Sequence, residues 1–152
     1  MKIGGVEVSR CEEVLVLPRM GGDLVFRAAA VISMDEFDAV CPKPEPPVRI
    51  TKNGKEPHLT ADSYVKMLQN WSEQRYAWMC IKSLSPSEIE WEKVDMERPT
   101  TWPKWTDELQ EAGISSTEMN RIQNLILEAN ALNEAKLKEA RESFLRGQGK
   151  EA

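Results

Sequence analysis

The chain has 152 residues, of which 41% are hydrophobic and 30% are charged. This composition is ordinary for a globular protein, so it excludes wholesale disorder and suits one domain, or one domain with a small appendage. The formal net charge of -5 disfavours nucleic acid as the main partner, because phosphate binding needs concentrated lysine and arginine. No apolar run approaches the roughly 20 residues that span a bilayer, and no signal-peptide pattern opens the chain. We therefore expect a cytoplasmic protein with no membrane partner.

Residues 1–41 are expected to form a β-rich subdomain. Two β-favouring runs, 13–17 and 24–32, lie on either side of a Gly21-Gly22 turn and predict a hairpin. A lone hairpin is marginal in water. The pattern therefore requires a third strand near residues 6–9, or docking on helices or on a partner.

A short helix through Phe37 and Val40, capped by Ser33 or Asp35, should close this subdomain. Residues 42–58 follow as a proline-rich linker. Four of the six residues 42–47 are proline, which favours a stiff, extended spacer. Either a β segment with a turn or a mobile loop fits residues 48–55.

Residues 59–147 are expected to form a helical domain, with residues 148–152 as a frayed C-terminus. A long helix should begin after Thr60 or Asp62. It should end near Leu84, because Pro86 biases the residue before it away from the helical conformation. Its expected apolar face recurs at steps of three and four: Tyr64, Met67, Leu68, Trp71, Trp78 and Met79.

Two stretches match the capping box, in which a serine and a glutamate three residues later cap each other. Residues 85–88 predict a short helix through Trp91. Residues 115–118 predict a longer helix with a buried stripe at Met119, Ile122, Leu125, Ile126 and Ala129. Between them, a helix beginning near Trp102 should end at Gly113.

Asn133 can cap the last helix, which should carry an apolar stripe and stop at Gly147. The stripe consists of Leu137, Ala140, Phe144 and Leu145. Together the elements predict an α+β fold: a small N-terminal hairpin or sheet, a proline-rich linker, and a mainly α-helical domain of four to five helices.

No catalytic or metal-binding constellation is expected. The lone histidine, His58, has no cysteine or histidine at metal-ligand spacing. The three cysteines are too far apart for a C-x-x-C motif and are expected to be reduced and structural: Cys11, Cys41 and Cys80. Glu88 and Glu92 would face solvent as neighbours on a helix, so an acid–base pair is disfavoured. We expect no enzymatic activity, no cofactor and no metal.

All five tryptophans lie between Trp71 and Trp105. Trp71 and Trp78 are seven residues apart on one helical face, which favours the core. Trp102 and Trp105 open a helix after a proline-broken connection, and both a core position and a partner groove remain open for them. The candidate partner-binding residues are Trp91, Trp102, Trp105 and Leu109.

Three patterns resemble one protein family. They are I-E-W-E-x-V-D with P-x-T-W-x-x-W-x-x-E-L-x-x-A-G between Ile89 and Gly113, A-N-x-L-x-E-x-x-L-x-x-A-R-x-x-F-L from Ala129 to Leu145, and F-D…C-P-x-P-x-P-P from Phe37 to Pro47. The resemblance is to the tail assembly chaperones of long-tailed, non-contractile bacteriophages, and it covers most of the chain.

The resemblance implies a protein that works in the host bacterial cytoplasm. Such proteins coat or solubilise the tape-measure protein and help recruit tail-tube subunits, and some also occur in a frameshifted longer form. The alternative is a structural tail or tail-completion protein retained in the virion, whose hairpin and proline-rich arm bridge subunits by strand addition. Homo-oligomerisation is left open by the sequence.

Overall fold

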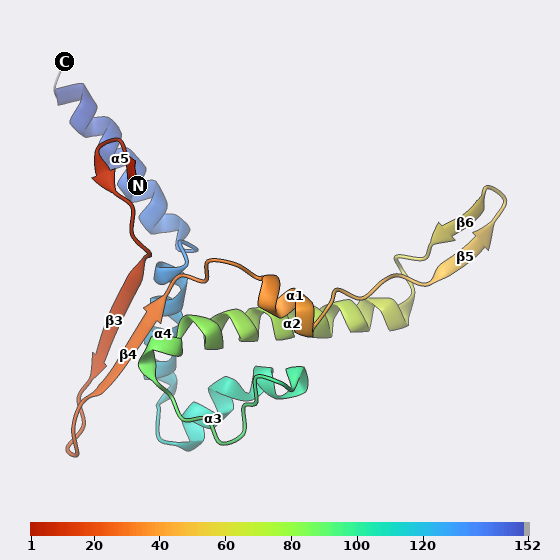
Figure 1. The fold of residues 1–152 in the computed structure, drawn as a ribbon, viewed down its shortest axis with the longest axis horizontal. Helices are drawn as coiled ribbons and strands as arrows, with labels where there is room; N and C mark the ends of the chain where they lie inside the picture. Colours follow the sequence, from red (N-terminus) through yellow and green to blue (C-terminus); the bar gives the residue numbers. More distant parts are fainter. Residues whose placement is uncertain (151–152) are drawn as a thin grey trace. The chain divides into compact units, whose positions relative to one another are not determined.

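The computed structural model describes residues 1–150, and only the backbone of residues 148–150. It has an α+β fold with small antiparallel hairpins and five α-helices along the described chain (Figure 1). Two compact units form. The first contains Met1–Val31, Ser83–Ile89 and the described residues from Ile114 onward, and the second contains Ile32–Lys82 and Glu90–Gly113. This grouping runs across the sequence-based segments 1–41, 42–58 and 59–147, because each unit takes residues from distant parts of the chain.

In the first unit, the predicted hairpin is confirmed. Strands β3 (Glu12–Leu17) and β4 (Leu24–Ala29) pair antiparallel, with Leu15 opposite Phe26. Gly22 lies in the connecting turn with a φ of 123°, which glycine adopts without the cost that a side chain would add. The strands β1 (Lys2–Ile3) and β2 (Val6–Glu7) form a separate two-stranded pair. The hairpin therefore gains no third strand.

Helix α4 (Ser116–Ala129) contacts both strands of the hairpin instead. The expected capping box at its start is present. The Glu118 backbone N–H donates to the Ser115 hydroxyl, and the Ser115 backbone N–H donates to the Glu118 carboxylate. Its apolar stripe is buried as predicted: Met119, Ile122, Leu125, Ile126 and Ala129. Of the alternatives for stabilising the hairpin, docking on a helix is the one adopted.

Two serines bind the outer edge of β4. The Ser87 hydroxyl accepts from the Arg27 backbone N–H (2.7 Å) and donates to the Arg27 carbonyl (2.8 Å). The buried Ser83 hydroxyl donates to the Ala29 carbonyl (2.8 Å) and accepts from the Asn130 amide (3.0 Å). Such pairing offsets the cost of removing these polar groups from water.

The expected helix from residue 85 through Trp91 is wrong. Only a short 3₁₀ helix forms, η1 (Ser85–Ser87), and Glu88 ends it in the left-handed conformation with a φ of 55°. The reason is tertiary: Ser87 is held by its two hydrogen bonds to β4, so the chain turns away where a helix would continue.

Helix α4 ends in a Schellman motif. The Leu132 N–H donates to the Leu127 carbonyl and the Ala131 N–H donates to the Glu128 carbonyl. Ala131 takes the left-handed position, with a φ of 55°, where glycine is usual.

Helix α5 (Glu134–Lys150) follows, and the predicted cap is confirmed because the Asn133 side chain accepts from the Lys136 N–H. The helix continues past Gly147, so the expected stop there is wrong. A glycine inside a helix costs about 1 kcal/mol relative to alanine and need not end it. Of the expected frayed end 148–152, residues 148–150 are helical and residues 151–152 lie outside the described chain.

The second unit begins with α1 (Asp35–Val40), which buries Phe37. No side chain caps this helix at its first residue, although the Ser33 hydroxyl accepts from the Asp35 N–H. Strands β5 (Val48–Thr51) and β6 (Gly54–Pro57) pair antiparallel within the predicted linker. Of the two alternatives for residues 48–55, a β segment with a turn is the one that forms.

Helix α2 (Asp62–Ser83) confirms the predicted long helix and its ends. Residues 99–104 then form a second 3₁₀ helix, η2 (Pro99–Lys104), which leads into α3 (Trp105–Glu111). Gly113 follows the α3 C-cap residue with a φ of 115°, so the predicted glycine stop is confirmed.

We predict that Ser83→Ala lowers the free energy of unfolding by about 1–3 kcal/mol. It removes both partners of the buried Ser83 hydroxyl and leaves the Asn130 amide and the Ala29 carbonyl less satisfied. Urea denaturation measures the change. The matched control is Ser72→Ala on the exposed surface of the same helix, expected to stay within about 0.5 kcal/mol. Equal effects would contradict the role assigned to Ser83.

Candidate functional site

Three of the four candidate partner-binding residues are core residues. Trp102, Trp105 and Leu109 keep 0%, 3% and 7% of their surface exposed. The Trp102 indole N–H donates to the Asp95 carbonyl (3.0 Å), which ties η2 to the loop before it. Of the two alternatives left open by the sequence for Trp102 and Trp105, burial favours the core.

The fourth candidate, Trp91, is half-buried and precedes a loop held by one carboxylate. Glu108 on α3 accepts from the backbone N–H groups of Glu92 (2.6 Å), Lys93 (2.5 Å) and Val94 (3.4 Å). Lys93 also pairs with a carboxylate on α3. This arrangement positions a loop and leaves the Glu108 carboxylate engaged, so we assign it a structural role.

The second unit is centred on Phe37. Its ring centroid lies 5.9 Å from that of Trp71, 5.8 Å from that of Trp78 and 6.0 Å from that of Trp102. Tilted rings at such separations attract each other beyond simple area burial. The sequence did not identify Phe37 as the centre, because no local pattern links it to residues 34 to 65 positions away.

A shallow hollow of about 210 Å³ lies beside Trp71, between the proline-rich segment and α2. The indole N–H of Trp71 donates to the Cys41 carbonyl (3.0 Å), and the Lys43 and Arg75 cations lie 5.7 and 5.9 Å from the ring centroid. The hollow is lined by Cys41, Pro42, Pro44, Met67, Asn70, Trp71 and Gln74. Trp71 is thus a half-buried ring between cations, and the hollow is small for a drug-sized ligand.

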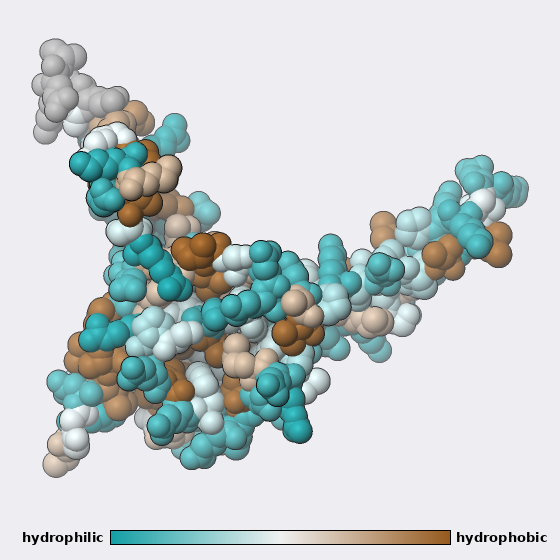
Figure 2. Space-filling view, in the orientation of Figure 1, coloured by the Kyte–Doolittle hydropathy of each residue, from teal (hydrophilic) through white to brown (hydrophobic). Residues whose placement is uncertain are grey.

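Helix α5 presents exposed apolar side chains at helical spacing. Leu137, Phe144 and Leu145 keep 46%, 63% and 51% of their surface exposed. Figure 2 shows hydrophobic residues at the surface in this part of the chain, at upper left. Sequence periodicity identified this stripe as a packing face, but within the described chain no element buries it.

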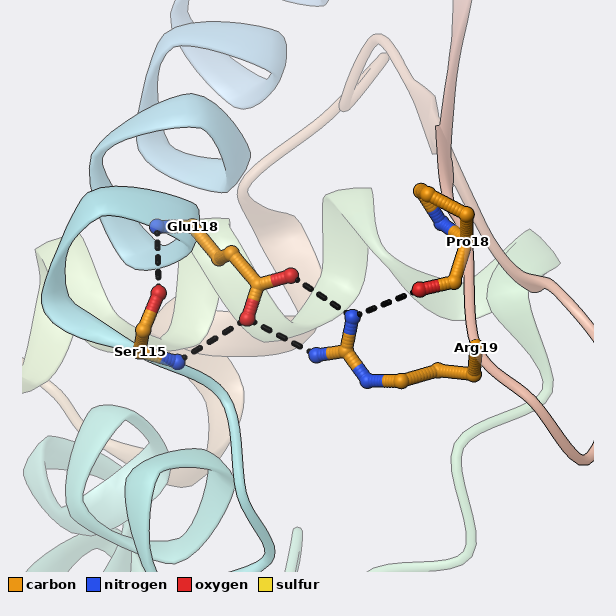
Figure 3. A network of polar contacts seen from close by, with 4 residues as sticks. All are labelled: Pro18, Arg19, Ser115 and Glu118. Carbon is orange, nitrogen blue, oxygen red and sulfur yellow. Dashed lines mark hydrogen bonds and ion pairs between the residues drawn. The ribbon is translucent and has the colours of Figure 1, made fainter.

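A polar network joins the β3–β4 turn to the start of α4 (Figure 3). The Arg19 guanidinium donates to both carboxylate oxygens of Glu118, at 2.7 and 2.9 Å, and also to the Pro18 carbonyl. The Arg19 hydrogen bonds, and next the one from the Ser115 backbone, lower the pKa of Glu118 from 4.5 to about 2. The Arg19–Glu118 pair is bidentate, and Glu118 also accepts from the Ser115 backbone N–H. The network therefore fixes the β3–β4 turn against the start of α4.

The three cysteines differ in exposure, and one is buried. Burial raises the pKa of Cys80 to about 12, so this thiol is protonated at neutral pH and is a poor nucleophile. Cys11 is exposed and Cys41 half-buried. Within residues 1–150, no group of three or more acidic, histidine or cysteine side chains gathers where a metal ion could bind. No helix in that range is both long and apolar enough to cross a bilayer.

Comparison with known proteins adds no relative: no family model, no curated protein and no solved structure matches this chain.

We predict that Glu118→Gln flattens the acid dependence of stability. Because the folded-state pKa of Glu118 lies below its ordinary value, its contribution is complete above about pH 4.5 and is lost as the pH falls towards 2. The parent chain should lose more stability across this window than the variant, and the variant should be less stable at pH 7. Denaturant midpoints across a pH series measure this.

The matched control for that experiment is Glu142→Gln, which removes a carboxylate from the exposed surface of α5. It should leave the pH dependence of the parent chain unchanged. Parallel pH profiles for the parent and Glu118→Gln would show that the pair with Arg19 is not a stabilising contact.

Proposed function

We propose that this protein is a tail assembly chaperone of a long-tailed bacteriophage, which binds the tape-measure protein and helps recruit tail-tube subunits. The observation that carries the proposal is the exposed apolar stripe of α5. It coincides with the C-terminal pattern, from Ala129 to Leu145, on which the family resemblance rests. The stretch that resembles the family therefore also carries a helix face whose apolar side chains remain largely exposed among the described residues.

The chemistry of α5 suits a helical partner. Leu137, Phe144 and Leu145 recur at steps of seven and eight, so they share one face of the helix. The other face carries charged residues, including Glu139, Glu142 and Arg146. A tape-measure protein is a long helical chain with apolar stripes, and two such faces remove each other from water by side-by-side packing.

The base of α5 is held firmly enough to present this face. Its first turn is capped by Asn133, and Lys136 forms an ion pair with Glu128 of α4 (2.9 Å). The Schellman motif at Ala131 fixes the direction in which the chain leaves α4. A partner bound along α5 would thus be bound to the β3–β4–α4 assembly.

The remaining parts of the proposal rest on composition and on the family resemblance. The net charge of -5 would help to keep a complex with an apolar chain dispersed. The proposed role is binding without catalysis or cofactor, in the host bacterial cytoplasm, with protein partners and neither nucleic acid nor membrane.

We predict that Leu137→Ala with Phe144→Ala abolishes solubilisation of a co-expressed tape-measure protein. The two side chains are 46% and 63% exposed, so the fold should survive, with stability within about 0.5 kcal/mol per site. Truncating two binding anchors typically weakens a complex by about 1–2 kcal/mol each. Soluble tape-measure protein after centrifugation is the measurement, with circular dichroism to check folding.

The matched control is Glu139→Ala with Arg146→Ala, on the opposite face of the same helix and with no change in net charge. It should solubilise the tape-measure protein as the parent chain does. If both double variants behave like the parent, α5 is not the binding face.

A structural tail or tail-completion protein is the second candidate, favoured by the β5–β6 hairpin. Val48 and Ile50 on β5 are 64% and 85% exposed, and the two strands pair only with each other. Such a hairpin could add to a sheet in a neighbouring subunit. We predict that mass spectrometry of purified virions finds no stoichiometric peptides from this chain; abundant peptides would favour the structural role over a transient chaperone.

A further inference from the structure

The hydrogen-bonding edge of β3 that faces away from β4 is open. In an antiparallel pair, alternate residues exchange hydrogen bonds with the partner strand, and the residues between them point their N–H and C=O groups outward. The Ala30 N–H donates to the Cys11 carbonyl, which fixes this alternation along the register from Glu12 to Leu17. The outward groups therefore belong to Glu12, Val14 and Val16.

The two edges of this sheet differ. On β4 the outward groups belong to Val25, Arg27 and Ala29, and the serines of the η1 region bind those of Arg27 and Ala29. Among the described strands, β3 pairs with β4 alone, and Figure 1 shows no further strand beside it. A hollow of about 270 Å³ lies beside residues 13–15 of β3, lined on its other side by α4 residues Arg121, Asn124, Leu125 and Glu128. Open edges in monomers are commonly protected by charged side chains, by proline or by a bulge. In residues 12–17 the charges are confined to Glu12 and Glu13, proline is absent and the register is unbroken, so the edge from Val14 to Leu17 carries none of these protections.

We propose that this edge binds a second copy of the chain, with β3 pairing antiparallel to β3 of the partner about a two-fold axis at Val14. This register sets Val14 opposite Val14 and Glu12 opposite Val16. Every outward residue then meets an outward residue, as a hydrogen-bonded ladder requires. Two-fold pairing of one strand with itself is isologous and closes at a dimer.

Repulsion between like charges and the missing N–H of proline favour this register over the registers centred on Glu12, Glu13 or Leu15. Centring the pair on Glu13 or on Glu12 would bring identical carboxylates directly opposite each other, which is destabilising. Centring it on Leu15 would set Glu12 opposite Pro18, which has no N–H to donate. With Val14 at the centre, Glu12 and Glu13 face Val16 and Leu15.

The exposed face of the hairpin is continuous across the proposed pair. Val14, Val16 and Val25 are 53%, 50% and 38% exposed and share one face of the hairpin, because Val16 pairs with Val25 and Val14 lies two residues before Val16. Figure 2 shows hydrophobic residues gathered where this hairpin lies, at lower left. Pairing would join the two sets of valines on a four-stranded sheet, with cross-strand contacts that stabilise it. Because the ladder is short, the association should depend on concentration.

This inference does not depend on the proposed function. The first experiment is light scattering of the full chain across a concentration series. We predict a monomer–dimer equilibrium that Val14→Pro abolishes. The Val14 N–H points outward, so proline there removes a donor for the second copy and none for β4. The matched control is Val25→Pro, at the outward position on β4, which should still dimerise.

A cross-linking experiment reports on the register and does not depend on whether the proline variants fold. In a background with Cys11→Ser and Cys41→Ser, Val14→Cys places two thiols on residues whose Cα atoms are about 5.5 Å apart, within disulfide range. Oxidation should give covalent dimers. Val16→Cys is the matched control, because the two cysteines would lie about 14 Å apart along the ladder and should not cross-link.

A chain that is monomeric throughout the series and forms no Val14→Cys cross-link overturns the proposal. So does a dimer that survives Val14→Pro and cross-links equally well from both cysteine positions, since it would use another surface. A dimer that is lost in Val14→Pro, kept in Val25→Pro and cross-linked only through Val14→Cys supports it.

Discussion

A two-stranded hairpin cannot bury enough surface to stand alone in water, and the first unit of this protein is built around that constraint. Helix α4 covers one face of β3–β4 with its apolar stripe. The hydroxyls of Ser83 and Ser87 bind the outer edge of β4. Ala28 and Ala29, poor strand formers by propensity, are fully buried in β4.

The second unit also contains an element too short to be stable alone, and packing among aromatic rings stabilises it. Phe37 comes from a six-residue helix that could not persist alone, and it contacts three tryptophans from α2 and η2. The polar atoms of those tryptophans are also used, since the indole N–H groups of Trp71 and Trp102 donate to backbone carbonyls. The tryptophans therefore organise loops as well as fill the core.

The functional interpretation rests on the surfaces that each unit leaves exposed. Because Trp102 and Trp105 are buried in the core, the proposals rest on three exposed surfaces: the stripe on α5, the edge of β3 and the β5–β6 hairpin. They suit different partners, because a helix face pairs through side chains whereas a strand edge pairs through backbone groups. A protein with both could bind a helical chain and a copy of itself at once.

Local patterns in the sequence predicted the hairpin, the ends of α2, the capping box of α4 and its buried stripe, and the glycine stop at Gly113. Each depends on neighbours within a few residues, so the sequence determined them by itself. Only the tertiary structure decided what needs distant residues. Ser87 forms hydrogen bonds to β4, so the helix expected after it does not form. Phe37 packs against Trp102 in the core. The stripe on α5 has the same periodicity as that on α4. One is buried and the other exposed, because periodicity marks an apolar face and contact with the rest of the chain decides whether that face is covered.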